Sequence, residues 1–75
     1  MKTRYRHIHF QDQAPFFVGT ERVFTCHNNR THDCLGAVSY NVEWRKWMFQ
    51  PESYTEYSID CLRDIADFLE QLPKD

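Results

Sequence analysis

The most regular hydrophobic pattern lies near the C-terminal end of the chain. Apolar side chains recur at spacings of three and four over Ile59–Leu72, which predicts an amphipathic helix. Ser58 suits the N-cap, Asp60 places a negative charge in the first turn, and Pro73 closes the segment. The predicted apolar stripe must pack against another element, and it contains Cys61, Leu62, Ile65, Ala66, Phe68, Leu69 and Leu72.

Two segments rich in aromatic and β-branched residues predict a hairpin in the middle of the chain. Leu35–Tyr40 and Lys46–Gln50 are the expected strands, and the connection Asn41–Arg45 has five residues, a usual hairpin length. Pro51 lacks a backbone donor and is expected to end the second strand. Alternation gives each strand one face with a pair of large side chains, namely Val38 with Tyr40 and Trp47 with Phe49.

The N-terminal half carries a weaker pattern. Thr3–Phe10 alternates and predicts a strand, but the alternation is impure and leaves open which side is buried. Glu21–His27 predicts a second strand, and Asn28–Thr31 predicts a turn because Asn accommodates left-handed backbone. Gln11–Thr20 is expected to be a loop or crossing segment, anchored to the core by Phe16, Phe17 and Val18. The two sides of the first strand are Arg4, Arg6, Ile8 and Phe10 against Tyr5, His7 and His9.

These elements predict an α+β fold, with a small antiparallel sheet of three to four strands covered by one C-terminal helix. The length of 75 residues suits a single domain, 1–75. Two Trp, six Phe and four Tyr supply the apolar surface that so small a core needs. Because the core takes most of these rings, and small-molecule pockets occupy about 300–1,000 Å³, we expect neither an enzyme nor a bound cofactor.

Composition and charge indicate the expected compartment and the expected kind of partner. A membrane-spanning helix needs about 20 consecutive apolar residues, which the pattern does not provide. The basic start Met1–His7 is not followed by the apolar stretch of a secretory signal, so we expect a cytoplasmic protein. Residues 1–50 carry a net charge of +3 and residues 51–75 a net charge of -5. The overall charge of -2 lacks the basic excess typical of nucleic-acid-binding proteins and suits a protein partner better.

The acidic residues and the hairpin connection supply the candidate contact residues. The acidic residues track the outer side of the predicted helix, which is also what an ordinary solvated helix face looks like. The connection places an aromatic ring and two cations together, and Trp and Arg are enriched at binding hot spots. A lid-like Trp44 packed back over the sheet is the alternative. The candidate partner-binding residues are Trp44, Arg45, Lys46, Glu56, Asp60, Asp64 and Asp67.

The cysteine and histidine residues are of types that bind metals or act as nucleophiles, but their spacing does not suit either role. Cys26, His27, His32 and Cys34 are the residue types that bind zinc, but neighbouring strand residues face opposite ways and no C-x₂₋₄-C pair is present. We therefore expect no metal site there, nor in the His7 and His9 pair. A Cys26–Cys34 disulfide is disfavoured in a reducing compartment. Cys61, near the predicted helix start, belongs to the apolar stripe and has no recognisable base beside it.

A resemblance to a group of known proteins indicates the biological context in which this chain is expected to act. Residues 35–69 carry a glycine-containing strand, a Trp-Arg hairpin and a helix led by Cys-Leu. The residues that carry the pattern are Leu35, Gly36, Val38, Tyr40, Trp44, Arg45, Trp47, Phe49, Pro51, Cys61, Leu62, Ile65 and Phe68. In this order they are similar to small uncharacterised proteins of bacteriophages and prophages. The resemblance implies a mobile-element accessory protein made in the cytoplasm of a bacterial host, and such proteins often bind host proteins.

Three functional hypotheses follow, and the last of them is a structural domain stabilised by zinc, which requires stoichiometric metal and would unfold with a chelator. The first is a non-catalytic protein that binds a host protein complex, with inhibition of a defence system such as CRISPR or restriction as its consequence. The second is a nucleic-acid-binding module that uses the basic side chains around Trp44. Those side chains are Arg4, Arg6, Arg22, Arg45 and Lys46.

Overall fold

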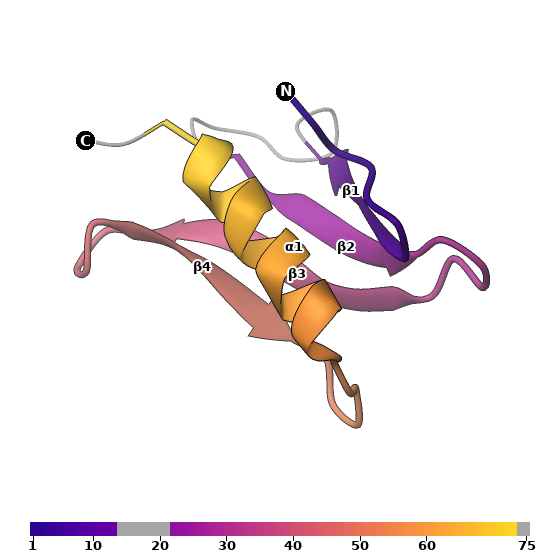
Figure 1. Cartoon of the computed structure of the whole chain (residues 1–75). Helices are drawn as coiled ribbons and strands as arrows, with labels where there is room; N and C mark the ends of the chain where they lie inside the picture. The colour runs from indigo at the N-terminus through magenta and orange to yellow at the C-terminus, as the bar shows by residue number, and fades with distance from the viewer. Residues whose placement is uncertain (14–21, 74–75) are drawn as a thin grey trace.

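The computed structural model describes residues 1–13 and 22–73, which form four strands and one helix (Figure 1). The elements are β1 (Ile8–Asp12), β2 (Phe24–Asn28), β3 (Cys34–Asn41), β4 (Lys46–Pro51) and α1 (Ile59–Gln71). The strands form one antiparallel sheet in the order β1-β2-β3-β4. Helix α1 crosses one face of this sheet diagonally (Figure 1). The predicted α+β fold, a meander covered by one C-terminal helix, is therefore confirmed.

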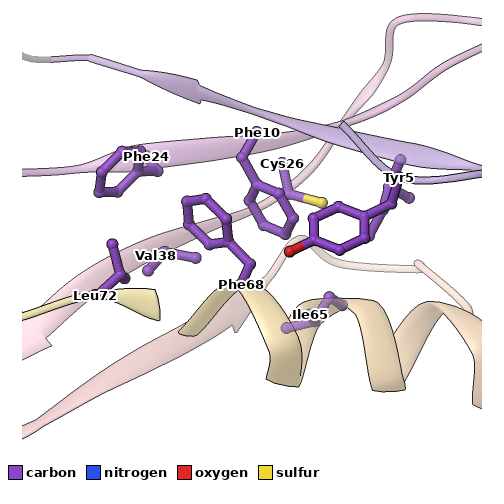
Figure 2. Packing of buried hydrophobic residues seen from close by; sticks show 9 residues of the cluster. Tyr5, Phe10, Phe24, Cys26, Val38, Ile65, Phe68 and Leu72 are labelled. Atoms are coloured by element: carbon purple, nitrogen blue, oxygen red, sulfur yellow. The ribbon is translucent and has the colours of Figure 1, made fainter. Parts of the chain in front are cut away.

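The core lies between α1 and the sheet, and the rings of Phe10, Phe24 and Phe68 pack together within it (Figure 2). Phe68 of α1 stacks on Phe10 of β1 with centroids 3.9 Å apart and planes 2° apart, and it meets Phe24 of β2 edge-on at 5.1 Å. Cys26 and Val38 lie on the same face of the sheet and are 0% exposed. Ring pairs contribute about 0.5–1.5 kcal/mol beyond the area that they bury, so Phe68 holds the helix to two strands at once.

The N-terminal segment corrects the prediction of one continuous strand over Thr3–Phe10. The chain turns back before β1, so that the first part of this segment runs along the outer edge of β1. The Phe10 N–H donates to the Thr3 carbonyl oxygen at 2.8 Å, and the Tyr5 N–H donates to the Ile8 carbonyl oxygen at 2.8 Å. This reversal carries the Tyr5 ring into the core, edge-on to Phe10 at 6.0 Å. Simple alternation along one strand predicts that the two rings lie on opposite sides.

The loop predicted over Gln11–Thr20 and the turn predicted over Asn28–Thr31 agree with the structure in part. Gln11 and Asp12, expected in a loop, belong to β1. The apolar anchors expected in that loop, Phe16, Phe17 and Val18, lie outside the described residues. The turn after β2 is confirmed, because the Asn28 side-chain oxygen accepts the N–H groups of Arg30 and Thr31 at 2.8 and 3.1 Å.

The predicted hairpin is confirmed as β3 and β4, with Val38 opposite Phe49 and Tyr40 opposite Trp47. A bulge interrupts the β2–β3 pairing, because Cys26 lies opposite Gly36 whereas the next residue pairs with Cys34. The extra residue, Leu35, packs against the core beside the buried Gly36. The bulge is the reason why two consecutive residues of β3 share the helix side of the sheet.

Helix α1 begins where the sequence predicts. The Ser58 side chain caps it by accepting the Cys61 N–H at 3.2 Å. The apolar stripe is only partly covered, because Ile65, Phe68 and Leu72 are buried whereas Leu62 is 52% exposed. The apolar side of α1 is therefore wider than its contact with the sheet. No helix in the described ranges is long and apolar enough to cross a bilayer.

Candidate partner-binding surfaces

The hairpin tip, defined as Trp44, Arg45 and Lys46, projects from the sheet between β3 and β4. The Trp44 N–H donates to the Asn41 side-chain oxygen at 2.9 Å, which holds the loop in a tight turn. Arg45 has φ 56, a left-handed conformation that non-glycine residues adopt infrequently. The Trp44 side chain is 64% exposed. The alternative in which it lies back over the sheet is therefore excluded.

The second tryptophan of the hairpin has the opposite role. Trp47 packs edge-on against Tyr40 at 5.4 Å and against Phe24 at 6.4 Å. Its Nε1–H donates to the Pro73 carbonyl oxygen at 2.7 Å, just past the end of α1. Trp47 therefore joins the hairpin to the helix, and only Trp44 is left as an exposed aromatic ring at the tip.

The acidic side of α1 is partly engaged within the chain. The Tyr5 hydroxyl donates to the Asp67 carboxylate at 2.8 Å and accepts from the Gln71 amide at 3.1 Å. Burial raises the pKa of Tyr5 above its usual value of 10, and the hydrogen bond to Asp67 acts in the same direction. Asp67 therefore ties the N-terminal segment to the helix and is a structural residue as well as an exposed acid.

Asp60 and Asp64 border a shallow cleft of about 240 Å³ between α1 and the segment before β1. The other lining residues are basic or titratable: Arg6, His7 and Arg63. Positive side chains therefore interleave with the carboxylates, so this part of the helix is less negative than its acidic residues alone imply. The remaining candidate, Glu56, is exposed in the loop that precedes the helix.

The candidate residues form two surfaces rather than one. The hairpin tip begins β4, whereas Glu56, Asp60 and Asp64 follow the end of β4 and begin α1. Because these features lie at opposite ends of one strand, they lie at opposite ends of the sheet (Figure 1). A single flat contact that uses all seven predicted residues is not available in this geometry.

The basic residues of the nucleic-acid hypothesis are divided in the same way. Arg45 belongs to the hairpin tip, whereas Arg6 lines the cleft at the other end of the sheet. Arg22 forms an ion pair with Asp12 at 2.8 Å and lies over the Phe24 ring at 4.8 Å. These cations do not make one continuous basic surface around Trp44.

The cysteine and histidine residues of the β2–β3 turn are separated by the sheet. Cys26 points into the core, and burial raises the pKa of its thiol to about 12. His27 lies on the helix-free face, and Cys34 is exposed with its sulfur 3.6 Å from the Gly36 carbonyl oxygen. Within residues 1–13 and 22–73, no three side chains of the metal-binding types are placed to hold an ion. All three cysteines are free thiols.

The helix-free face carries a polar cluster that the sequence pattern does not predict. The His9 ring, 8% exposed, stacks on His27 with centroids 5.4 Å apart. The Asn29 amide nitrogen donates to the Tyr5 carbonyl oxygen, so its Oδ1 accepts from His9 Nδ1 at 2.7 Å. His27 Nε2 lies 2.7 Å from the Thr25 hydroxyl. These ring nitrogens are committed to hydrogen bonds within the chain, which makes the cluster a structural feature.

The fold and the surfaces define a small α+β protein with an open four-stranded sheet and exposed candidate contacts at both ends. Comparison with protein-family models, with curated proteins and with solved structures finds no match for this chain.

Proposed function

We propose that this chain is a non-catalytic protein that binds a partner protein through the hairpin tip. The observation that supports this proposal is the exposed Trp44 ring on a loop fixed by Asn41 and by the left-handed Arg45. A large rigid ring loses little entropy when a partner covers it, and Trp and Arg are enriched among residues that dominate binding energy. A loop that is ordered before binding lowers the ordering cost further.

The setting of this binding comes from the resemblance of residues 35–69 to phage and prophage proteins. It makes a protein complex of a bacterial host the first candidate partner, and inhibition of a defence system such as CRISPR or restriction the expected consequence. The cleft residues Asp60 and Asp64, with Glu56 beside them in sequence, are a second contact area for a large partner. Nucleic-acid binding is less favoured, because the basic residues lie at both ends of the sheet.

The experiment is capture of partners from a bacterial host lysate by the tagged protein, compared among variants and with nuclease treatment. Trp44→Ala should reduce the captured partner at least about tenfold, as expected for a hot-spot aromatic residue. Val42→Ala is the matched control, because Val42 is an exposed apolar residue of the same loop. Equal capture by the wild type and by Trp44→Ala would exclude the tip as the contact.

Two further arms separate the remaining surfaces. Asp60→Asn with Asp64→Asn tests the cleft, while Asp67 is left intact because of its hydrogen bond to Tyr5. A partner lost only from this double variant would move the contact to the other end of the sheet. Capture that disappears after nuclease treatment would favour the nucleic-acid hypothesis instead.

A further inference from the structure

Within residues 1–13 and 22–73, no strand pairs with the outer edge of β4. The Glu52 N–H donates to the Leu35 carbonyl oxygen at 2.9 Å, so residues 52, 50, 48 and 46 turn their backbone groups toward β3. The backbone groups of Trp47 and Phe49 therefore point away from the sheet. No residue in the described ranges hydrogen-bonds to them. Trp47 and Phe49 of each copy thus present two N–H groups and two carbonyl groups along this edge.

The opposite edge of the sheet is treated differently. The outer edge of β1 is covered by the N-terminal segment, with the Phe10 N–H bonded to Thr3 and a bridge between Arg4 and His9. Proteins usually protect exposed edges with charged residues, proline or covering segments. On β4 these devices stand only at the ends, as Lys46 and Pro51. The four strand residues between them, 47–50, include neither a charged side chain nor a proline.

We propose that β4 pairs antiparallel with β4 of a second copy, joining the two sheets into one of eight strands around a two-fold axis at Met48. In this register Trp47 of one copy lies opposite Phe49 of the other, and their four free backbone groups per copy are all bonded. Centring on Phe49 instead would use Pro51, which has no N–H. Centring on Trp47 would use the left-handed Arg45.

The side chains also suit this register. Lys46 of one copy faces Gln50 of the other and lies diagonal to Glu52 of that copy, so opposite charges meet at both ends of the interface. A parallel arrangement would place Lys46 against Lys46. On the helix side, the half-buried Trp47 and Phe49 rings become cross-strand neighbours. The edge is therefore complementary to itself in charge as well as in hydrogen bonding.

The exposed part of the α1 stripe lies on the same side. Asp67 and Gln71 turn toward the N-terminal segment, as their bonds to Tyr5 and Lys2 show. Helical geometry places Leu62 on the opposite flank of α1, toward β4. A two-fold axis perpendicular to the sheet puts both helices on one face. The exposed Leu62 side chains then border the new aromatic pairs rather than water.

The first test is the mass in solution at about 10 to 300 µM, the range in which modest self-association is measurable. The wild type should reach twice the monomer mass as concentration rises. Met48→Lys and Met48→Glu should each remain monomeric, because like charges would meet on the two-fold axis. An equimolar mixture of the two variants should restore the dimer. Gln11→Lys, on the same face of β1, is the matched control and should dimerise.

The second test reports the register. In the predicted ladder Met48 of each copy forms a non-hydrogen-bonded pair, with Cα atoms about 4.5 Å apart and within disulfide range. Met48→Cys in a Cys34→Ser background should give a covalent dimer on oxidation, whereas Gln11→Cys should not. A wild type that stays monomeric at all concentrations, or Met48 variants that dimerise alone, would overturn the proposal. Neither result bears on the Trp44 tip, which the capture experiment tests separately.

Discussion

At the scale of single residues, Gly36 is the position with the least room for change. A Cβ atom there would lie 2.6 Å from the Gln50 carbonyl oxygen and 2.6 Å from the Phe49 ring. The carbonyl belongs to the neighbouring strand and cannot turn aside without breaking the β3–β4 pairing. The absence of a side chain at Gly36 therefore allows Phe49 to lie across the strand and reach Tyr57 at 5.7 Å.

We expect Gly36→Ala to lower the free energy of unfolding by about 1–3 kcal/mol, the usual cost of overpacking a well-filled site. Urea unfolding followed by tryptophan fluorescence measures this change. Ser39→Ala, on the other face of β3, is the matched control and should change stability by less than about 0.5 kcal/mol. A Gly36→Ala midpoint equal to that of the wild type would show that β3 and β4 can separate without cost.

At the scale of elements, local signals explain what could be predicted and long-range contacts explain what could not. The bounds of α1 were predictable because Ser58 and Pro73 act on their immediate neighbours. Tyr5 could not be placed from its own surroundings, because its burial depends on Phe10 and on Asp67, 62 residues away. The bulge at Leu35 likewise depends on pairing with another strand, which alternation within one strand does not encode.

The same distinction between local signals and long-range contacts applies to the candidate partner-binding surfaces. An exposed loop with Trp44 was predictable as a contact, but whether the ring projects or folds back depends on tertiary structure. The separation of Trp44 from Asp60 follows from topology, which becomes visible only when the strands are ordered. The His9 and His27 stack needed the β1–β2 register, in which these two residues are direct partners. The sequence signal available for this stack was the alternation that places His9 on the face opposite Ile8.

The N-cap of α1 gives a prediction at this scale. Ser58→Ala removes the side-chain oxygen that accepts the Cys61 N–H, and we expect a loss of about 1 kcal/mol in unfolding free energy. Far-UV circular dichroism during urea unfolding measures the loss. Ser53→Ala, in the exposed loop before the helix, is the control and should leave the midpoint in place. Similar midpoints for both variants would mean that packing of Phe68 alone determines where α1 begins.

At the scale of the whole molecule, the N-terminal segment is hydrogen-bonded to the C-terminal part of α1. Lys2 and the Gln71 amide exchange two hydrogen bonds, at 2.7 and 2.8 Å, and Tyr5 reaches both Asp67 and Gln71. The N-terminal segment therefore covers the edge of β1 and the acidic flank of α1 together. Because Tyr5 takes part in these contacts, the stability of the fold depends on the protonation of its hydroxyl, as it does on that of Cys26 and Tyr57.

These buried groups predict loss of stability at alkaline pH. Burial raises the pKa of Cys26 from 9 to about 12, and it raises the pKa of Tyr5 and of Tyr57 above 10. The folded chain therefore keeps protons that the unfolded chain releases above about pH 9. The unfolded state then binds fewer protons, so the free energy of unfolding falls as pH rises, by at most about 1.4 kcal/mol per pH unit for each group. Below about pH 8 all three groups are almost fully protonated in both states and add little pH dependence.

Urea midpoints measured between about pH 7 and pH 12 test this linkage, because every group that titrates differently in the two states contributes to the slope. Tyr5→Phe removes one titrating group and should flatten the decline above about pH 10, although the lost bond to Asp67 lowers its stability at neutral pH. Tyr54→Phe is the matched control, because Tyr54 is fully exposed. A decline equally steep in all three proteins would show that the Tyr5 hydroxyl titrates as freely in the folded chain as in the unfolded one. In that case the hydrogen bonds between the N-terminal segment and α1 would break before the rest of the fold unfolds.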